Sequence, residues 1–210
     1  MEKRIKLPVR AAPGVHETAR ELLKGERGKI LDIAAGSGAF LSSLNKEHFE
    51  RKACELFSKK FKLKDVPCCS VYLNEGILPY ENNSFDLVTA IEIIEHIENP
   101  YQFIREVHRV LKPRGKLVLT TPNVTNWYSR LLYLFSLKFA NFFDKEDYLD
   151  LGAGHITPIF PATIKMLIKD KFKIINIIYN RTHIPILNIN LPIKRCRLLG
   201  EITILKLEKI

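Results

Sequence analysis

The stretch Ile30-Leu31-Asp32-Ile33-Ala34-Ala35-Gly36-Ser37-Gly38 is an apolar run that ends in small residues and two glycines. We expect residues 29–34 to form a buried strand and residues 39–44 to begin a helix, with a tight turn between them. Small residues let the backbone approach a ligand closely, and the first turn of a helix carries free N–H groups. Those groups suit the carboxylate of an amino-acid-like ligand, and the Asp32 carboxylate suits an ammonium group or a nearby sulfonium. The stretch therefore predicts a ligand-binding turn after the first strand of an α/β fold.

The rest of the chain alternates strand and helix patterns, which predicts a mainly parallel sheet with helices on both faces. With 210 residues, no internal repeat and no low-complexity linker, the chain fits one domain with a sizeable core. The lysine-rich stretch between the second and third strands is short, so we expect a reduced helix or a loop there. The expected strands are residues 29–34, 51–57, 68–73, 84–92, 116–121, 173–179 and 201–207, and the expected helices are residues 15–24, 39–44, 99–111, 123–143 and 161–171.

The turn after the first strand disfavours a dinucleotide. A G-x-G-x-x-G pattern beginning at Gly36 would need its third glycine at the position of Leu41. Leucine there crowds the contact between helix and strand and obstructs the pyrophosphate, so we set a nicotinamide or flavin site aside. Glu55 lies near the end of the second expected strand, where an acid can accept hydrogen bonds from both hydroxyls of a ribose. Together with the preceding turn, Glu55 favours a nucleoside ligand.

Three further segments follow the ligand-binding turn in order, and their combination is specific although each alone is weak. They are Leu78-Pro79-Tyr80-Glu81-Asn82-Asn83-Ser84-Phe85-Asp86-Leu87-Val88, Ile91-Glu92-Ile93-Ile94-Glu95-His96-Ile97-Glu98-Asn99-Pro100 and Arg109-Val110-Leu111-Lys112-Pro113-Arg114-Gly115-Lys116. With these segments the chain resembles the class I S-adenosylmethionine-dependent methyltransferases, particularly the groups called type 11 and type 12. The resemblance extends from Lys29 to about Pro158.

The resemblance implies a Rossmann-like α/β fold, a three-layer sandwich around a mostly parallel seven-stranded sheet with an antiparallel last strand. It implies S-adenosylmethionine as the cofactor and S-adenosylhomocysteine as the product. The turn from Asp32 to Gly38 would line the methionine moiety, Glu55 would bind the ribose, and the Leu73 region would border the adenine. We expect His16 on an N-terminal lid over the cofactor. The complete expected cofactor set is Asp32, Ala34, Ala35, Gly36, Gly38, Glu55, Leu56, Tyr72, Leu73, Ile91 and His16.

Three positions depart from the pattern of this family. Ala34 stands where the first glycine of the motif is usual, and it adds a methyl group close to the ligand. Tyr72 stands where an acid commonly precedes Leu73, so the contact to the adenine amino group is lost or replaced by stacking. Arg114 replaces a common glycine in the turn before the fifth strand, which matters for folding. The first two departures leave open a cofactor-binding but catalytically degenerate protein that acts as a regulator or partner.

Histidine is the residue best suited to act as a base near neutral pH, and His155 and His96 are the catalytic candidates. His155 lies in the glycine-flanked stretch 152–158, after the fifth strand, where this family places substrate-covering elements. Glu92, Glu95 and His96 form an E-x-x-E-H motif, which is similar to a divalent-metal site in the O-methyltransferases of the ubiquinone pathway. If the turn is helical, Glu92 shares a face with the other two. The motif is also widespread in relatives without a known metal, and we predict no metal.

Composition limits the partners. The formal net charge is +10, but the Lys and Arg residues are spread along the chain, so nucleic acid is possible and not favoured. We expect a small-molecule methyl acceptor, and an RNA or protein methyltransferase stays open as an alternative. No apolar run approaches the roughly 18 residues of a membrane span, and residues 1–10 lack the apolar core of a secretory signal. The cysteines make no C-x-x-C pair, which predicts reduced thiols in a cytoplasmic protein. The oligomeric state stays open.

Residues 123–143 are rich in aromatic side chains. Such a stripe is typical of a core or a dimer contact. Its place after the fifth strand also makes it a candidate cover over an apolar or lipid-like acceptor. We therefore expect residues 1–210 to be a single methyltransferase domain in which residues 123–160 form a substrate-covering insertion.

Overall fold

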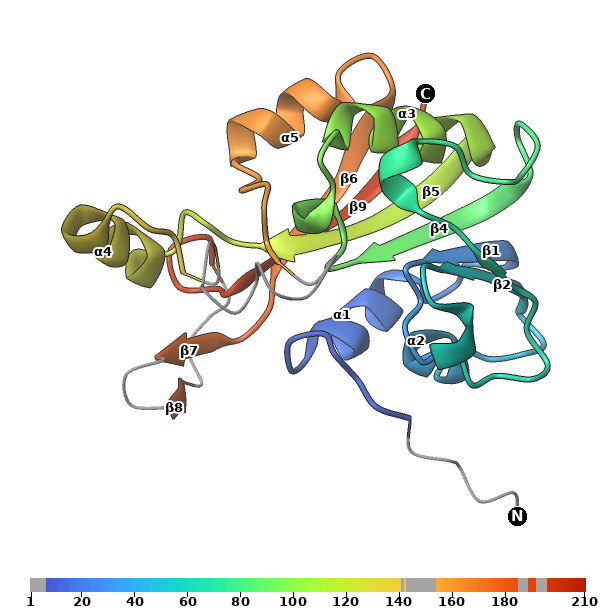
Figure 1. Ribbon diagram of the computed structural model, residues 1–210, viewed down its shortest axis with the longest axis horizontal. Helices are drawn as coiled ribbons and strands as arrows, with labels where there is room; N and C mark the ends of the chain where they lie inside the picture. Colours follow the sequence, from blue (N-terminus) through green and yellow to red (C-terminus); the bar gives the residue numbers. More distant parts are fainter. Residues whose placement is uncertain (1–6, 141, 143–153, 185–188, 192–195) are drawn as a thin grey trace.

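A mixed sheet lies at the centre of the molecule (Figure 1). The computed structural model describes residues 7–140, 142, 154–184, 189–191 and 196–210. Seven strands pair in the order β3-β2-β1-β4-β5-β9-β6; the first five are parallel, and β9 is antiparallel to both β5 and β6. The expected sheet with its antiparallel last strand is thereby confirmed. The bounds are β1 Gly28–Ile33, β2 Phe49–Glu55, β3 Cys68–Ser70, β4 Phe85–Ile91, β5 Leu111–Pro122, β6 Phe172–Tyr179 and β9 Ile202–Lys209.

Helices pack on both faces of the sheet, as the alternating sequence pattern predicts (Figure 1). Side chains of β1 alternate between the faces, so Leu31 and Ile33 join one core cluster and Ile30 joins the other. All three are fully buried, and each such burial contributes about 1.5–3 kcal/mol. The first cluster includes residues of α3 (Pro100–Val110) and α5 (Pro161–Ile168); the second includes residues of α1 (Val15–Leu22) and α2 (Ala39–Ser42).

The helix α3 shows how the sequence sets both of its ends. The Asn99 side chain accepts a hydrogen bond from the Gln102 amide at 3.0 Å, and Pro100 occupies the first turn. Buried side chains including Ile104 and Val107 then recur at helical spacing. The helix ends at Val110, because Leu111 is extended and starts β5.

The strand order reverses between β1 and β4, and this reversal positions the ligand site. The chain leaves β1 toward β2 on one side and reaches β4 on the other. The connections after these two strands therefore diverge at their carboxyl ends, which is where open α/β sheets bind ligands. The turn after β1 and the turn after β4 meet at this place, which we call the carboxyl edge.

Several elements differ in extent from the sequence expectation. The helix expected over residues 123–143 forms only as α4 (Trp127–Ser136), because Leu137 adopts a left-handed φ of 57° and ends it; residues 141 and 143 lie outside the described part. The lysine-rich stretch holds only the 3-10 turn η1 (Ser58–Lys60). A pair of short strands, β7 (Thr182–Ile184) and β8 (Ile189–Leu191), was not expected. The remaining 3-10 turns are η2 (Leu73–Glu75) and η3 (Ile94–His96).

The first part of β5 contains the unusual Arg114. This residue has a left-handed φ of 62°, a conformation in which glycine carries no steric cost. Leu111 pairs with Phe85, and the register then shifts before Lys116 pairs with Leu87. The strand therefore begins earlier than residue 116 and contains an irregularity at the site of the replaced glycine.

Candidate active site

The turn after β1 holds a buried acid and three left-handed residues. Asp32 is 2% exposed, and its Oδ1 accepts a hydrogen bond from the Thr89 hydroxyl at 2.6 Å. Burial raises the pKa of Asp32 to about 7 and outweighs the opposing effect of that hydrogen bond. Ala34, Gly36 and Gly38 have φ values of 57°, 54° and 86°. The chain thus turns sharply at this point, and Ala34 adopts the conformation that its family's glycine would take without strain.

The end of β2 is tied to this turn by two hydrogen bonds. The Gly36 amide donates to Glu55 Oε2 at 2.8 Å, and the Ala35 amide donates to the Cys54 carbonyl at 3.1 Å. No atom lies within 4 Å of the position that a Cβ on Gly36 would occupy, so the space beside the turn is open. A carboxylate beside open space can accept hydrogen bonds from the hydroxyls of a ribose, and the glycine turn lets an amino-acid tail approach the backbone. The residues present therefore fit S-adenosylmethionine.

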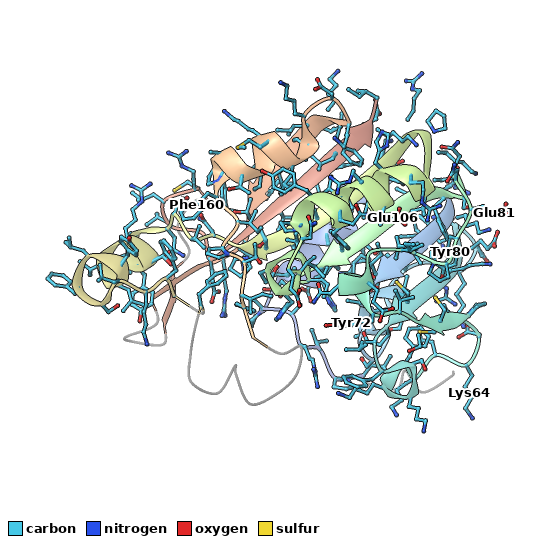
Figure 2. All side chains as sticks on the ribbon, turned by 45° about the horizontal axis from the view of Figure 1, so that its top comes forward. Lys64, Tyr72, Tyr80, Glu81, Glu106 and Phe160 are labelled. Carbon is cyan, nitrogen blue, oxygen red and sulfur yellow. The ribbon has the colours of Figure 1, made fainter. Side chains whose placement is uncertain are left out.

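The expected adenine side lies along the residues after β3. Tyr72 is 47% exposed, Leu73 opens the turn η2, and Leu56 is half-buried. An open cavity of about 260 Å³ adjoins Tyr72. Figure 2 shows Tyr72 on this side of the molecule. The cavity is lined by Ser70, Val71, Tyr72, Glu75, Ile77 and Pro79.

The N-terminal segment crosses the carboxyl edge. The Ser37 hydroxyl donates to the Pro8 carbonyl at 2.7 Å, and the Ala12 amide donates to Glu92 Oε2 at 2.7 Å. His16 packs its ring against Phe40 of α2 at 5.4 Å. The segment expected as a lid thus contacts the turns after β1 and β4, while His16 faces α2.

Glu92 makes a contact that sequence reasoning did not find. It follows β4 with a left-handed φ of 48°, and Ile91 before it packs against the same core cluster as Ala35. Burial raises the pKa of Glu92 to about 7, although the Ala12 amide opposes the shift. Glu92 precedes the turn η3 that carries Glu95 and His96, and its carboxylate binds the N-terminal segment. An acid directly after a buried strand was the signal for this role.

The structure brings the two candidate histidines together. The His96 and His155 ring centroids are 4.6 Å apart, and His96 Nδ1 lies 2.9 Å from the Gly154 carbonyl oxygen. The amides of Ile156 and Thr157 both donate to the Glu95 carbonyl, at 3.0 and 2.9 Å. The loop after the fifth strand is thereby fixed to η3. Gly152 and Ala153, expected as part of a hinge, lie outside the described residues.

The Glu95 side chain lies fully buried beside these histidines. Within the described part of the chain, no donor hydrogen-bonds to either of its carboxylate oxygens, and burial raises its pKa to about 8. The candidate ligand atoms of Glu95, His96 and His155 all lie within 4.8 Å of one another. This group can hold a proton at neutral pH, and its donor types are also those of a cation site.

A larger cavity, of about 470 Å³, lies at the opposite edge of the sheet. Lys29, Asp86 and Lys112 are among its lining residues. Asp86 accepts hydrogen bonds from the Lys29 amide and the Lys112 ammonium, both at 2.8 Å. The charges there are paired and far from the divergent turns, so we assign no active site to this cavity.

Comparison with known proteins agrees with the fold and with the turn. Residues 31–119 match the family described as a methyltransferase domain. An uncharacterised protein of Methanocaldococcus jannaschii is 36% identical over 97 residues, which cover 45% of this chain and 40% of that protein. A ubiquinone biosynthesis O-methyltransferase of Xanthomonas oryzae pv. oryzae is 33% identical over 116 residues, 51% of this chain and 48% of the enzyme. The chain spans about half the length of these curated relatives.

More distant matches cover more of the chain. A demethylmenaquinone methyltransferase of Lactiplantibacillus plantarum is 26% identical over 162 residues, 66% of this chain and 68% of that enzyme. The crystal structure of an S-adenosylmethionine-dependent methyltransferase from Archaeoglobus fulgidus has a TM-score of 0.66 at 18% identity and covers 93% of each chain. Residues 31–119 therefore match a methyltransferase domain, and the chain has the fold of the solved S-adenosylmethionine-dependent methyltransferases; this similarity implies S-adenosylmethionine as the cofactor.

Proposed function

We propose that the protein transfers the methyl group of S-adenosylmethionine to a small-molecule acceptor by in-line displacement. The observation that carries this proposal is the hydrogen bond from the Gly36 amide to Glu55, which joins the glycine turn and the ribose-type acid at the reversal of the strand order. The cofactor, when bound, supplies a methyl group activated by a sulfonium. The protein then has to hold, align and shield the reacting groups.

The residues proposed to hold the cofactor come from five neighbouring segments of the carboxyl edge. The turn after β1 presents backbone N–H groups and the Asp32 carboxyl, and Glu55 presents an acid for the ribose. The Pro8 and Ala12 contacts support a covering role for the N-terminal segment, which excludes water. The proposed contacts are Asp32, Ala34, Ala35, Gly36, Gly38, Glu55, Leu56, Tyr72, Leu73, Ile91 and His16.

We propose His155 and His96 as the residues that move the acceptor's proton. When His96 Nδ1 donates to the Gly154 carbonyl, the lone pair of the neutral ring lies on Nε2. His155 lies within ring contact of His96, and the raised pKa of Glu95 keeps a neutral acid behind the pair. We propose transfer without a metal. Activity that survives exhaustive chelation would support this, and activity restored by one divalent cation would contradict it.

We propose that residues 1–210 act as one domain and that residues 123–160 cover the acceptor. α4 stands away from the sheet (Figure 1), and its Leu134 and Phe135 are 71% and 80% exposed. An exposed apolar helix beside the carboxyl edge favours an apolar acceptor. Residues 141 and 143–153 of this insertion lie outside the described part of the chain.

We propose a cytoplasmic protein, since all four cysteines are free thiols. No described helix is long and apolar enough to span a bilayer. Positive charge spread along the chain gives nucleic acid no defined surface, so RNA is not the favoured acceptor. Binding to RNA that weakens steeply with salt would reverse this choice.

A second candidate is a cofactor-binding protein without turnover. The specific observation that favours it is Ala34, whose left-handed backbone adds a methyl group inside the turn. Saturable binding of S-adenosylmethionine without methylation of a broad panel of acceptors would favour this candidate.

Calorimetry with S-adenosylmethionine tests the proposal directly. Glu55→Ala should weaken binding at least about tenfold, because a ribose hydroxyl loses its acceptor in a shielded site. His155→Ala should change binding by less than about threefold, because its proposed role is in proton transfer. Glu50→Ala, an exposed acid on the same strand β2, is the matched control and should leave binding unchanged. No binding by the unmodified protein at millimolar concentration would contradict the proposal, and the reverse order of the two variants would reassign the ribose site.

A further inference from the structure

Two cysteines lie opposite each other on neighbouring strands behind the carboxyl edge. Cys54 of β2 pairs in register with Cys69 of β3. Both side chains belong to the core on the α3 face, whereas the adjacent Cys68 packs against the core on the other face. The two facing thiols are therefore neighbours, and Cys68 supplies a natural comparison one residue away.

The backbone spacing suits a bond between them. Residues directly opposite on neighbouring strands lie about 4.8 Å apart, within the roughly 4.4–6.8 Å that a disulfide requires between Cα atoms. β3 comprises three residues at the edge of the sheet and pairs with β2 on one side only. A short edge strand can shift slightly with little loss of packing.

The surroundings favour a thiolate at Cys69. Its Sγ lies 3.1 Å from the Tyr80 hydroxyl, which also lies 3.2 Å from the Ala53 carbonyl oxygen. The neighbouring Cys54 thiol lowers the pKa of Cys69 against the opposing effect of burial, and Tyr80 lowers it further; the same coupling raises the pKa of Cys54. Tyr80 is labelled in Figure 2.

The two thiols differ in access. Cys54 is 1% exposed, whereas Cys69 is only partly buried. A small oxidant in solution therefore meets Cys69 first. The buried Cys54 thiol lies behind it, where it can react only with its neighbour. This is the arrangement of a peroxide-reactive cysteine, Cys69, and a resolving cysteine, Cys54.

We propose that Cys69 and Cys54 form a peroxide-reactive thiol pair that closes to a disulfide. The Cys69 thiolate attacks a hydroperoxide; an S–O bond forms, the O–O bond breaks, and the leaving oxygen takes a proton and departs as water or an alcohol. Cys54 Sγ then attacks Cys69 Sγ; the S–S bond forms, the S–O bond breaks, and the hydroxyl leaves as water with the Cys54 proton. The thiols lose two electrons, and these electrons reduce the peroxide.

The pair is connected to the carboxyl edge by backbone bonds. The Cys54 carbonyl accepts the Ala35 amide of the ligand-binding turn, and Glu55 follows Cys54 directly. On the other strand, Ser70 follows Cys69 and lines the cavity beside Tyr72. Closing the disulfide fixes both side chains in new rotamers and adjusts the backbone on both sides of the proposed cofactor site. We infer weaker cofactor binding in the oxidised protein, and this consequence rests on the proposed function.

Oxidation of the protein with hydrogen peroxide tests the pair itself. Peptide mapping without reductant should find Cys54 linked to Cys69, with the link removed by dithiothreitol and with Cys196 still reduced. Cys68→Ala should form the link at the same rate. Cys54→Ala should instead accumulate a sulfenic acid at Cys69, trapped by dimedone. First oxidation at Cys68 or Cys196, or an unlinked Cys69 in the unmodified protein, would overturn the pair; because this last readout needs no variant, misfolding of Cys54→Ala leaves the test intact.

Calorimetry with S-adenosylmethionine on the reduced and oxidised protein tests the connection to the site. We expect binding at least about tenfold weaker after oxidation, with full recovery on reduction. Equal binding by both states would overturn the connection. If the reduced protein binds no cofactor, the proposed function fails, and the peptide map alone then decides whether the thiol pair exists.

Discussion

Acidic residues at the two edges of the sheet have opposite environments. At the amino edge, Asp86 binds Lys112, and Glu26 binds Lys116 and Lys206 at 2.6 and 2.8 Å. Burial disfavours both carboxylates, but the lysine hydrogen bonds outweigh it, so their pKa values are lowered. At the carboxyl edge, Asp32, Glu92 and Glu95 have no lysine or arginine partner among the described ion pairs, and burial raises their pKa values.

This contrast separates acids that hold the fold from acids that serve a site. A buried carboxyl without a base costs stability when it ionises, so its presence at a ligand-binding edge indicates a role other than folding. The paired acids of the amino edge need no ligand. The larger cavity lies at the amino edge, so charge pairing identifies the site better than cavity size does.

Replacing a glutamate with glutamine at each edge should give the largest difference in the free energy of unfolding. Glu26→Gln should lower the free energy of unfolding by about 2 kcal/mol, because two partly buried lysines lose their counter-ion. Glu95→Gln should leave it unchanged or raise it at pH 6, because the buried carboxyl is neutral in the folded state and ionises only on unfolding. Urea unfolding of both variants measures this.

A simple exposed pair supplies the control for that measurement. Lys46 binds Asp65 with side-chain exposures of 68% and 48%, so Lys46→Ala should cost less than about 0.5 kcal/mol. If Glu95→Gln destabilises the protein more than Glu26→Gln, the division between the edges is wrong.

The two edges should also respond to pH in opposite directions. The carboxyl-edge acids have folded pKa values near 7 to 8, above their unfolded values, so the folded state holds more protons between about pH 4 and 8. Their contribution to the free energy of unfolding is complete below about pH 4, and it is lost as the pH rises from there through the folded pKa values of about 7 to 8. The lysine-paired acids have lowered pKa values and lose their contribution as the pH falls below about 4.5.

The free energy of unfolding should therefore be highest near about pH 4 to 5 and should fall by at least about 1 kcal/mol by pH 9. Urea unfolding across this range measures the fall. Glu95→Gln should make the alkaline side flatter, whereas Lys112→Ala should leave that side unchanged. A stability that rises steadily from pH 5 to 9 would be inconsistent with raised pKa values at the carboxyl edge.

The smallest effect concerns one left-handed residue at each edge. Ala34→Gly and Arg114→Gly should each stabilise the fold by about 0.5–1 kcal/mol, because glycine adopts these φ values without a Cβ clash. Only Ala34→Gly should change the affinity for S-adenosylmethionine, since Arg114 lies near the start of β5, at the amino edge. Thermal unfolding and calorimetry on both variants measure the two effects. A change in affinity with Arg114→Gly would place that turn in the binding site.

Strands such as β1 and β4 could be predicted because they are apolar runs bounded by turn residues, and the resemblance supplied the order of the whole sheet. Helix ends were less predictable: the aromatic spacing after β5 continues past Ser136, but the backbone reverses at Leu137. Contacts between distant loops could not be read from spacing. The meeting of His96 with His155 depends on how the loop after β5 docks on η3.

The contact of Glu92 could not be predicted for the same reason, because it joins segments that are far apart in the sequence. Its sequence motif groups it with Glu95 and His96, but the path of the N-terminal segment gives its carboxylate a different partner. The cofactor residues assigned from sequence stay predictions, although the bond between Gly36 and Glu55 supports them.

Because the Ala12 amide donates a hydrogen bond to Glu92, its proton reports whether the N-terminal segment is closed over the carboxyl edge. While the N-terminal segment is closed, that proton is withheld from water; each opening exposes it to deuterium. The isotope uptake at Ala12 therefore measures how often the covering segment lifts, and ligand binding beneath it should slow that uptake without any label or substitution.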